Sequence, residues 1–130
     1  MQTVKRLVFV YNAEMSVLGG LRYAAERIKT GEDPCALCEI TYSGVMERAE
    51  WKQCRTHYSV SIDGVYKNEL DAPMSAAAAG SYPCVLAQVD AGYLRVLSAD
   101  EIASCRAADD SVLCLETTLR AGLARLGLGV

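Results

Sequence analysis

The run Leu7-Val8-Phe9-Val10-Tyr11 constrains the fold more than any other feature of this sequence. Its residues are apolar or aromatic with high β propensity, and the run has the length of a strand. A strand without a polar side chain on either face has to be covered on both faces. We therefore predict that residues 7–11 form a central strand of a sheet that is buried on both sides.

The following segments predict a βαβα order. Apolar residues recur at helical spacing after the first strand, and Gly31 stands where that helix would stop. They are Leu18, Leu21, Ala25 and Ile28. Glu39-Ile40-Thr41-Tyr42 has the composition of a second strand, and residues 45–57 that of a second helix. A helix that connects two strands of one sheet makes those strands parallel, with a right-handed crossover.

The last third of the chain predicts a β-hairpin followed by a helix. Residues 84–89 and 93–97 flank Asp90-Ala91-Gly92, a short loop with glycine where a hairpin favours positive φ. Ser98 and Glu101 match a capping box, and a leucine stripe continues beyond it. The segment from 58 to 81 has the weakest signal: a short strand at 60–62, a turn at Asp63-Gly64 and an alanine run at 76–79.

Composition limits the classes of protein to which the chain can belong. Its 130 residues suit one domain, residues 1–130, and 52% of them are hydrophobic. The net charge of -3 comes without a cluster of lysine and arginine, so we expect no nucleic-acid partner. No stretch approaches the roughly 20 apolar residues of a membrane span, and we expect no membrane partner. The high apolar fraction favours a homodimer.

The N-terminal residues resemble a signal peptide only in part. Lys5 and Arg6 precede the apolar run, but Asn12 and Glu14 interrupt it early, and no small-residue cleavage site follows. We therefore expect a cytoplasmic protein. Thiols stay reduced in the cytosol, so we expect most of the six cysteines to be free and to pack as small apolar residues.

Cys35 and Cys38 form the sharpest chemical motif, a C-x-x-C pair between the first predicted helix and the second predicted strand. This spacing suits a bound metal ion, a reversible disulfide or two buried thiols that support a turn. Glu32 and Asp33, shortly before the pair, would oppose a reactive thiolate and favour a bound cation. The motif therefore leaves metal ligation, structure and redox chemistry open, with a slight preference for the first two.

Cys54 and His57 extend the motif to C-x2-C-x15-C-x2-H, which is close to the spacing of structural zinc sites. If the second helix runs antiparallel to the second strand, its last turn returns to the end of the sheet that carries Cys35 and Cys38. Zinc bound by these four residues is one hypothesis. The alternative is that Cys54 belongs to a buried helical stripe with Trp51, while His57 is a solvated helix end.

The order βαβα, a connection, a hairpin led by Tyr82-Pro83 and a final helix resembles the thioredoxin-like superfamily. That resemblance implies a three-layer α/β sandwich with a mixed central sheet, and it implies a cis bond before Pro83. Oxidoreductases of the superfamily carry C-x-x-C directly after the first strand, where this chain has Asn12-Ala13-Glu14 without a cysteine. Cys35 and Cys38 would instead lie at the opposite end of the sheet. Cys84, next to Pro83, would lie at the usual end as a core thiol.

Segments 7–13, 35–42 and Glu50-Trp51 also resemble a small family of uncharacterised bacterial proteins with a C-x-x-C at this position. Together these features favour a thioredoxin-like protein that lacks the usual oxidoreductase site and uses its C-x-x-C end to bind zinc or a protein partner. The alternative is a thiol-disulfide oxidoreductase or redox sensor whose catalytic residues are Cys35 and Cys38. The sequence carries no phosphate-binding glycine loop and no nucleophile elbow.

Overall fold

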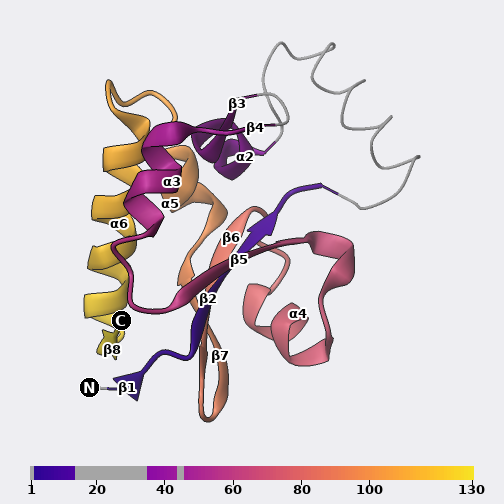
Figure 1. Ribbon diagram of the computed structural model, residues 1–130. Coiled ribbons are helices and arrows are strands. Elements are labelled where there is room, and N and C mark those ends of the chain that lie inside the picture. The colour runs from indigo at the N-terminus through magenta and orange to yellow at the C-terminus, as the bar shows by residue number, and fades with distance from the viewer. Residues whose placement is uncertain (1, 14–34, 44–45) are drawn as a thin grey trace.

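The structure, a computed structural model, describes residues 2–13, 35–43 and 46–130 (Figure 1). The helix predicted around Leu18 and Ile28 lies outside these residues. The strands are β1 (Gln2–Thr3), β2 (Arg6–Tyr11), β3 (Tyr42–Ser43), β4 (Met46–Glu47), β5 (Ser61–Tyr66), β6 (Cys84–Val89), β7 (Gly92–Leu97) and β8 (Leu128–Gly129). The helices are α2 (Ala36–Thr41), α3 (Ala49–Arg55), a 3-10 turn η1 (Lys67–Glu69), α4 (Ala72–Ala78), α5 (Ala99–Ala103) and α6 (Ser111–Arg125).

A mixed four-stranded sheet in the order β5-β2-β6-β7 is the centre of the molecule. Strand β2 is parallel to β5, with Leu7 opposite Ile62, and antiparallel to β6, with Val8 opposite Leu86. Strands β6 and β7 form the antiparallel hairpin that the sequence predicts. The predicted central strand is therefore confirmed, and the protein is of the mixed α/β class.

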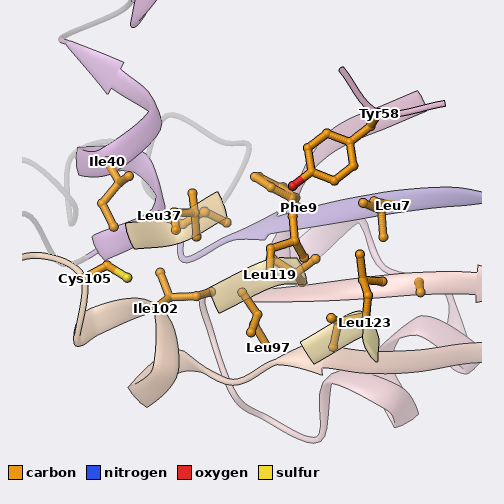
Figure 2. Packing of buried hydrophobic residues seen from close by; sticks show 14 of the residues in the cluster. Leu7, Phe9, Leu37, Ile40, Tyr58, Leu97, Ile102, Cys105, Leu119 and Leu123 are labelled. Atoms are coloured by element: carbon orange, nitrogen blue, oxygen red, sulfur yellow. The ribbon is translucent and has the colours of Figure 1, made fainter. Parts of the chain in front are cut away.

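The two faces of β2 belong to two separate hydrophobic clusters, because successive side chains of a strand point to opposite faces. Leu7 and Phe9 belong to the larger cluster, together with buried residues of α2, α3, α5 and α6 (Figure 2). Val8 and Val10 belong to the smaller cluster, which α4 covers. Figure 1 shows α4 on one side of the sheet and the other helices on the opposite side. Both faces of β2 are thus buried, as its composition requires.

The parallel partner of β2 differs from the prediction. We expected Glu39–Tyr42 to be this strand, but residues 36–41 form α2, and β5 takes the parallel position. Leu37, Ile40 and Thr41 follow the helical spacing of three and four residues and are all buried. The Thr41 hydroxyl donates to the Leu37 carbonyl oxygen at 2.7 Å. Packing on the core therefore overrides the β propensity of Ile40-Thr41-Tyr42.

The predicted turn at Asp63-Gly64 is also wrong, because both residues lie inside β5. Gly64 stands opposite Phe9, and a Cβ atom there would come within 2.7 Å of the Tyr11 ring. Glycine inside a strand marks such a close approach as readily as it marks a turn. The short strand predicted at 60–62 therefore extends to Tyr66, and the alanine run at 76–79 forms the carboxyl end of α4 and its C-cap.

Two predicted helices are shorter than expected. Residues 46–47 pair with 42–43 as β4 and β3, so the helix predicted from 45 to 57 is reduced to α3. The capping box of Ser98 and Glu101 is confirmed, but the helix it starts, α5, ends at Ala103. A second N-cap, Asp110, accepts from the Leu113 backbone N–H at 3.0 Å and starts α6. The Tyr82-Pro83 bond directly before β6 is cis.

Candidate functional site

Cys35 and Cys38 are joined by a disulfide at the start of α2, with 5.2 Å between their Cα atoms. Cys35 is the N-cap residue of the helix, and its sulfur accepts a hydrogen bond from the Cys38 backbone N–H at 3.2 Å. The Cys35 side chain is fully buried, whereas Cys38 is partly exposed. The two residues of the pair therefore differ in their access to solvent.

The disulfide lies at the carboxyl end of β2, and not at the opposite end as the sequence suggested. Asn12, the residue after β2, donates its backbone N–H to the Cys35 sulfur at 3.4 Å. The opposite end was predicted because residues 39–42 were expected to be a strand that starts beside the pair. Those residues belong to α2 and β3, so no strand of the central sheet starts beside the pair.

The amino end of β6 lies at the same end of the sheet, because Val10 pairs with Cys84 in the antiparallel ladder. Pro83, which precedes Cys84, is buried there. Cys84 itself belongs to the smaller cluster, on the face of the sheet away from Cys35. Burial raises the pKa of its thiol to about 12, so it is a core residue, as expected, and not a nucleophile.

Three tyrosines gather where β2 and β5 end and where α2 passes into β3. The Tyr11 ring meets Tyr42 edge-on at 6.0 Å and lies 6.5 Å from Tyr66. Burial raises the pKa of the Tyr11 hydroxyl above its ordinary value of 10.0, which keeps this group neutral. Tyr11 and Tyr42 are half-buried and Tyr66 is exposed, so the cluster packs the ends of β2, α2 and β5 against one another at the margin of the core.

The backbone that follows β2 is held by Lys67, the first residue after β5. Its ammonium group donates to the Asn12 side-chain oxygen at 3.1 Å, and its backbone N–H donates to the Ala13 carbonyl oxygen at 3.1 Å. These two bonds join the carboxyl ends of the parallel strands β2 and β5. They also fix the orientation of the residue whose N–H contacts the Cys35 sulfur.

The other two residues of the predicted zinc set, Cys54 and His57, lie in a different environment on α3 and just after it. Cys54 is a buried free thiol of the larger core cluster, and His57 is exposed. Within residues 2–13, 35–43 and 46–130, no group of three or more His, Cys, Asp or Glu side chains is arranged to hold a metal ion. The structure therefore does not gather the four residues, and zinc binding stays a prediction.

The neighbours of Cys54 explain its position. Burial first, and then a hydrogen bond with the Glu116 carboxylate of α6, raise the pKa of the Cys54 thiol to about 12. Glu116 also pairs with Arg120 at 3.2 Å, and the Arg120 guanidinium stacks 4.6 Å from the centre of the Tyr58 ring. Cys54 thus joins α3 to α6, which is the structural alternative that its helical stripe with Trp51 suggested.

The sequence analysis missed a second disulfide, Cys105–Cys114, with a Cα–Cα distance of 5.5 Å. It connects the end of the α5 segment to the first turn of α6. Figure 2 shows Leu37 and Ile40 of α2 pointing toward Ile102 and Cys105. Four of the six cysteines are therefore paired, which corrects the expectation that most are free thiols. The even cysteine count was the available signal.

None of the described helices is long and apolar enough to cross a membrane. Comparison with protein-family models, with curated proteins and with solved structures found no match. The function therefore has to be argued from the site itself.

Proposed function

We propose that this protein is a thiol-disulfide exchange protein on a thioredoxin-like scaffold, with Cys35 and Cys38 as its redox pair. The observation that carries the proposal is the bond between these two residues at the carboxyl end of the central strand, with one sulfur partly exposed. Between the two uses of the motif that the sequence left open, this geometry favours redox chemistry over zinc.

The sheet supports the thioredoxin-like part of the proposal. The order β5-β2-β6-β7, with one parallel pair followed by an antiparallel hairpin, agrees with the mixed central sheet that the resemblance implies. The parallel partner comes from a later segment than expected, so helices α2 and α3 and the β3–β4 pair precede it. In this arrangement the C-x-x-C pair reaches the carboxyl end of the first core strand from α2 and not from the residues directly after that strand.

The small loop that the pair closes supports reversible chemistry. Cys35 and Cys38 are three residues apart, whereas Cys105 and Cys114 are nine apart. Loop-closure entropy assigns about 2 kcal/mol to the first disulfide and about 3 kcal/mol to the second. Opening the Cys35–Cys38 bond therefore removes less stability from the fold than opening Cys105–Cys114 would. The Cys35 sulfur can still accept hydrogen bonds from backbone N–H groups as a thiol or thiolate.

The proposed reaction balances without a further cofactor. Two substrate thiols lose two electrons and two protons and form a disulfide, and the Cys35–Cys38 disulfide takes up both and becomes a dithiol. A low-molecular-weight disulfide restores the protein in the reverse direction. If no substrate is oxidised in quantity, the pair acts as a redox sensor, because the ratio of its disulfide to its dithiol form follows the surrounding redox potential.

The test measures exchange in the full-length protein. We expect oxidised wild-type protein to oxidise a dithiol peptide, and oxidised glutathione to regenerate it. Replacing Cys35 and Cys38 with serine should abolish exchange, while replacing Cys105 and Cys114 with serine, the matched control, should preserve most of it. Unchanged exchange in the first variant would refute the proposal. So would a Cys35–Cys38 bond that stays oxidised when Cys105–Cys114 is already reduced.

We infer the compartment from the second disulfide. Cys105–Cys114 is a separate bond that the proposed exchange does not use, and structural disulfides persist in oxidising compartments. This favours such a compartment over the cytoplasm expected from the sequence. Trapping thiols with an alkylating reagent at the moment of cell lysis tests the choice, because a cytoplasmic protein would carry the label on Cys105 and Cys114.

The homodimer expected from composition stays a proposal. Exposed apolar side chains on α6 and beyond it support it, among them Leu113, Leu126 and Val130. The mass of the protein in solution at high concentration tests the homodimer, and a strictly monomeric mass would refute it.

A further inference from the structure

We infer that Cys38 carries the sulfur that an incoming thiolate attacks, and that Cys35 is the sulfur that leaves. The inference rests on the proposed function and assigns separate roles to its two cysteines. It follows from the different surroundings of the two sulfurs in the same disulfide.

Access separates the two residues. The Cys35 side chain has no exposed surface and belongs to the larger core cluster with Leu37 and Trp51. Cys38 is partly exposed and packs only against the edge of that cluster. A thiolate attacks a disulfide along the line of the S–S bond, so it has to approach one sulfur from outside. Of the two residues, Cys38 is therefore the one with exposed surface in the described structure.

Stabilisation of the leaving charge also favours Cys35. Its sulfur accepts from the backbone N–H of Asn12 at 3.4 Å and from that of Cys38 at 3.2 Å. Hydrogen bonds to a charged group stabilise the charged form. The two bonds that Lys67 makes to Asn12 and Ala13 keep the first of these N–H groups in place. A negative charge that appears on Cys35 during exchange therefore meets two donors that are already oriented.

The step is a substitution at sulfur. A substrate thiolate forms a new S–S bond with Cys38, the bond between Cys38 and Cys35 breaks, and its electron pair leaves on Cys35 as a thiolate. A second substrate thiolate then attacks the substrate sulfur of this mixed disulfide. The substrate disulfide forms, Cys38 leaves as a thiolate, and the two cysteines take up the two protons released by the substrate thiols.

Trapping in the wild-type protein tests the assignment without a substitution. Oxidised full-length protein is mixed with reduced glutathione, quenched with an alkylating reagent within seconds, and digested for mass mapping. We expect glutathione on the Cys38 peptide and the alkyl group on Cys35. Glutathione mainly on Cys35 would overturn the inference and leave the proposed function intact. No reduction of the pair at all would refute the proposed function itself.

Single variants give a second measurement. Cys35→Ser leaves the Cys38 thiol, and Cys38→Ser leaves the Cys35 thiol; serine is a good N-cap residue, so α2 should keep its start in the first variant. We expect Cys35→Ser to react with an aromatic disulfide reagent at least about tenfold faster than Cys38→Ser, because access dominates the difference. Equal rates, or a faster Cys38→Ser, would contradict the assignment. The buried thiols of Cys54 and Cys84, present in both variants, are the internal control.

Discussion

The two halves of the predicted zinc set, Cys35–Cys38 and Cys54–His57, have the same ligand spacing in the sequence and different environments in the structure. The first pair is bonded across the start of α2, with one sulfur partly exposed. The second is divided between the core, which holds Cys54, and the solvent, which surrounds His57. Ligand spacing thus defines which residues could meet, while packing of the helices decides which of them do.

The difference originates in the helix that carries each pair. Helix α2 places its first turn against the carboxyl end of β2, so its amino-terminal cysteines lie at the edge of the core. Helix α3 packs on the sheet beside α6, and Trp51 stacks on Phe9 of β2 with 5.1 Å between ring centres. The stripe of α3 that contains Trp51 and Cys54 is therefore used for packing and is not free to turn toward Cys35.

The largest effect expected from this comparison is at Trp51. Its side chain is almost completely buried, so Trp51→Ala should lower the free energy of unfolding by about 3–5 kcal/mol through the cavity that it leaves. Denaturant unfolding of both proteins measures the loss. Lys52→Ala, an exposed position on the same helix, is the matched control and should stay within about 0.5 kcal/mol of wild type. A Trp51→Ala loss as small as the control would mean that α3 is not a core element.

The two disulfides should differ in their contribution to stability. Replacing Cys105 and Cys114 with serine should lower the free energy of unfolding by about 3 kcal/mol. Replacing Cys35 and Cys38 should lower it by about 2 kcal/mol, because this disulfide closes the shorter loop. Denaturant unfolding under non-reducing conditions measures both. The reverse order would indicate that Cys35–Cys38 is the structural bond, and it would weaken the redox proposal.

The stability that Glu116 contributes through its hydrogen bond with Cys54 should depend on pH. Hydrogen bonds from Cys54 and then Arg120 outweigh desolvation and lower the pKa of the Glu116 carboxyl from its ordinary value of 4.5. A carboxylate whose folded pKa is lowered stabilises the fold above the unfolded pKa and loses this effect as the pH falls through the folded value. Glu116→Gln should therefore cost about 1 kcal/mol at neutral pH.

The difference between Glu116→Gln and wild type should shrink as the pH falls below 4.5. Denaturant unfolding at neutral and acidic pH measures this change. Glu50→Gln, at an exposed position of α3, is the control and should show little difference at either pH. A loss in Glu116→Gln that is independent of pH would contradict the role of the charge.

The smallest effect is expected at His57. Because its side chain is exposed, His57→Ala should change the free energy of unfolding by no more than about 0.5 kcal/mol. Zinc content, measured by elemental analysis of reduced protein purified without a histidine tag, should be the same for wild type and variant. Stoichiometric zinc that disappears in His57→Ala would restore the four-ligand hypothesis and contradict the separation of the two pairs.

Parts of the fold with a strong local signal could be predicted from the sequence. The continuous apolar run of β2, the hairpin around Asp90 and the capping box of Ser98 each depend on neighbouring residues, and the structure confirms them. Prediction was wrong where two local signals conflict. Ile40-Thr41-Tyr42 has the composition of a strand, and Gly64 has the character of a turn, yet burial of Ile40 and the approach of the Tyr11 ring decide both positions.

For the site, the motif of Cys35 and Cys38 and the candidates that could join it are readable from the residues alone. The position of the pair at the carboxyl end of β2, the packing of Cys54 on α6 and the pairing of Cys105 with Cys114 depend on the fold. The physical reason is that a motif depends on spacing along the chain. Burial, hydrogen bonding of a sulfur and disulfide pairing depend on which distant elements pack against one another.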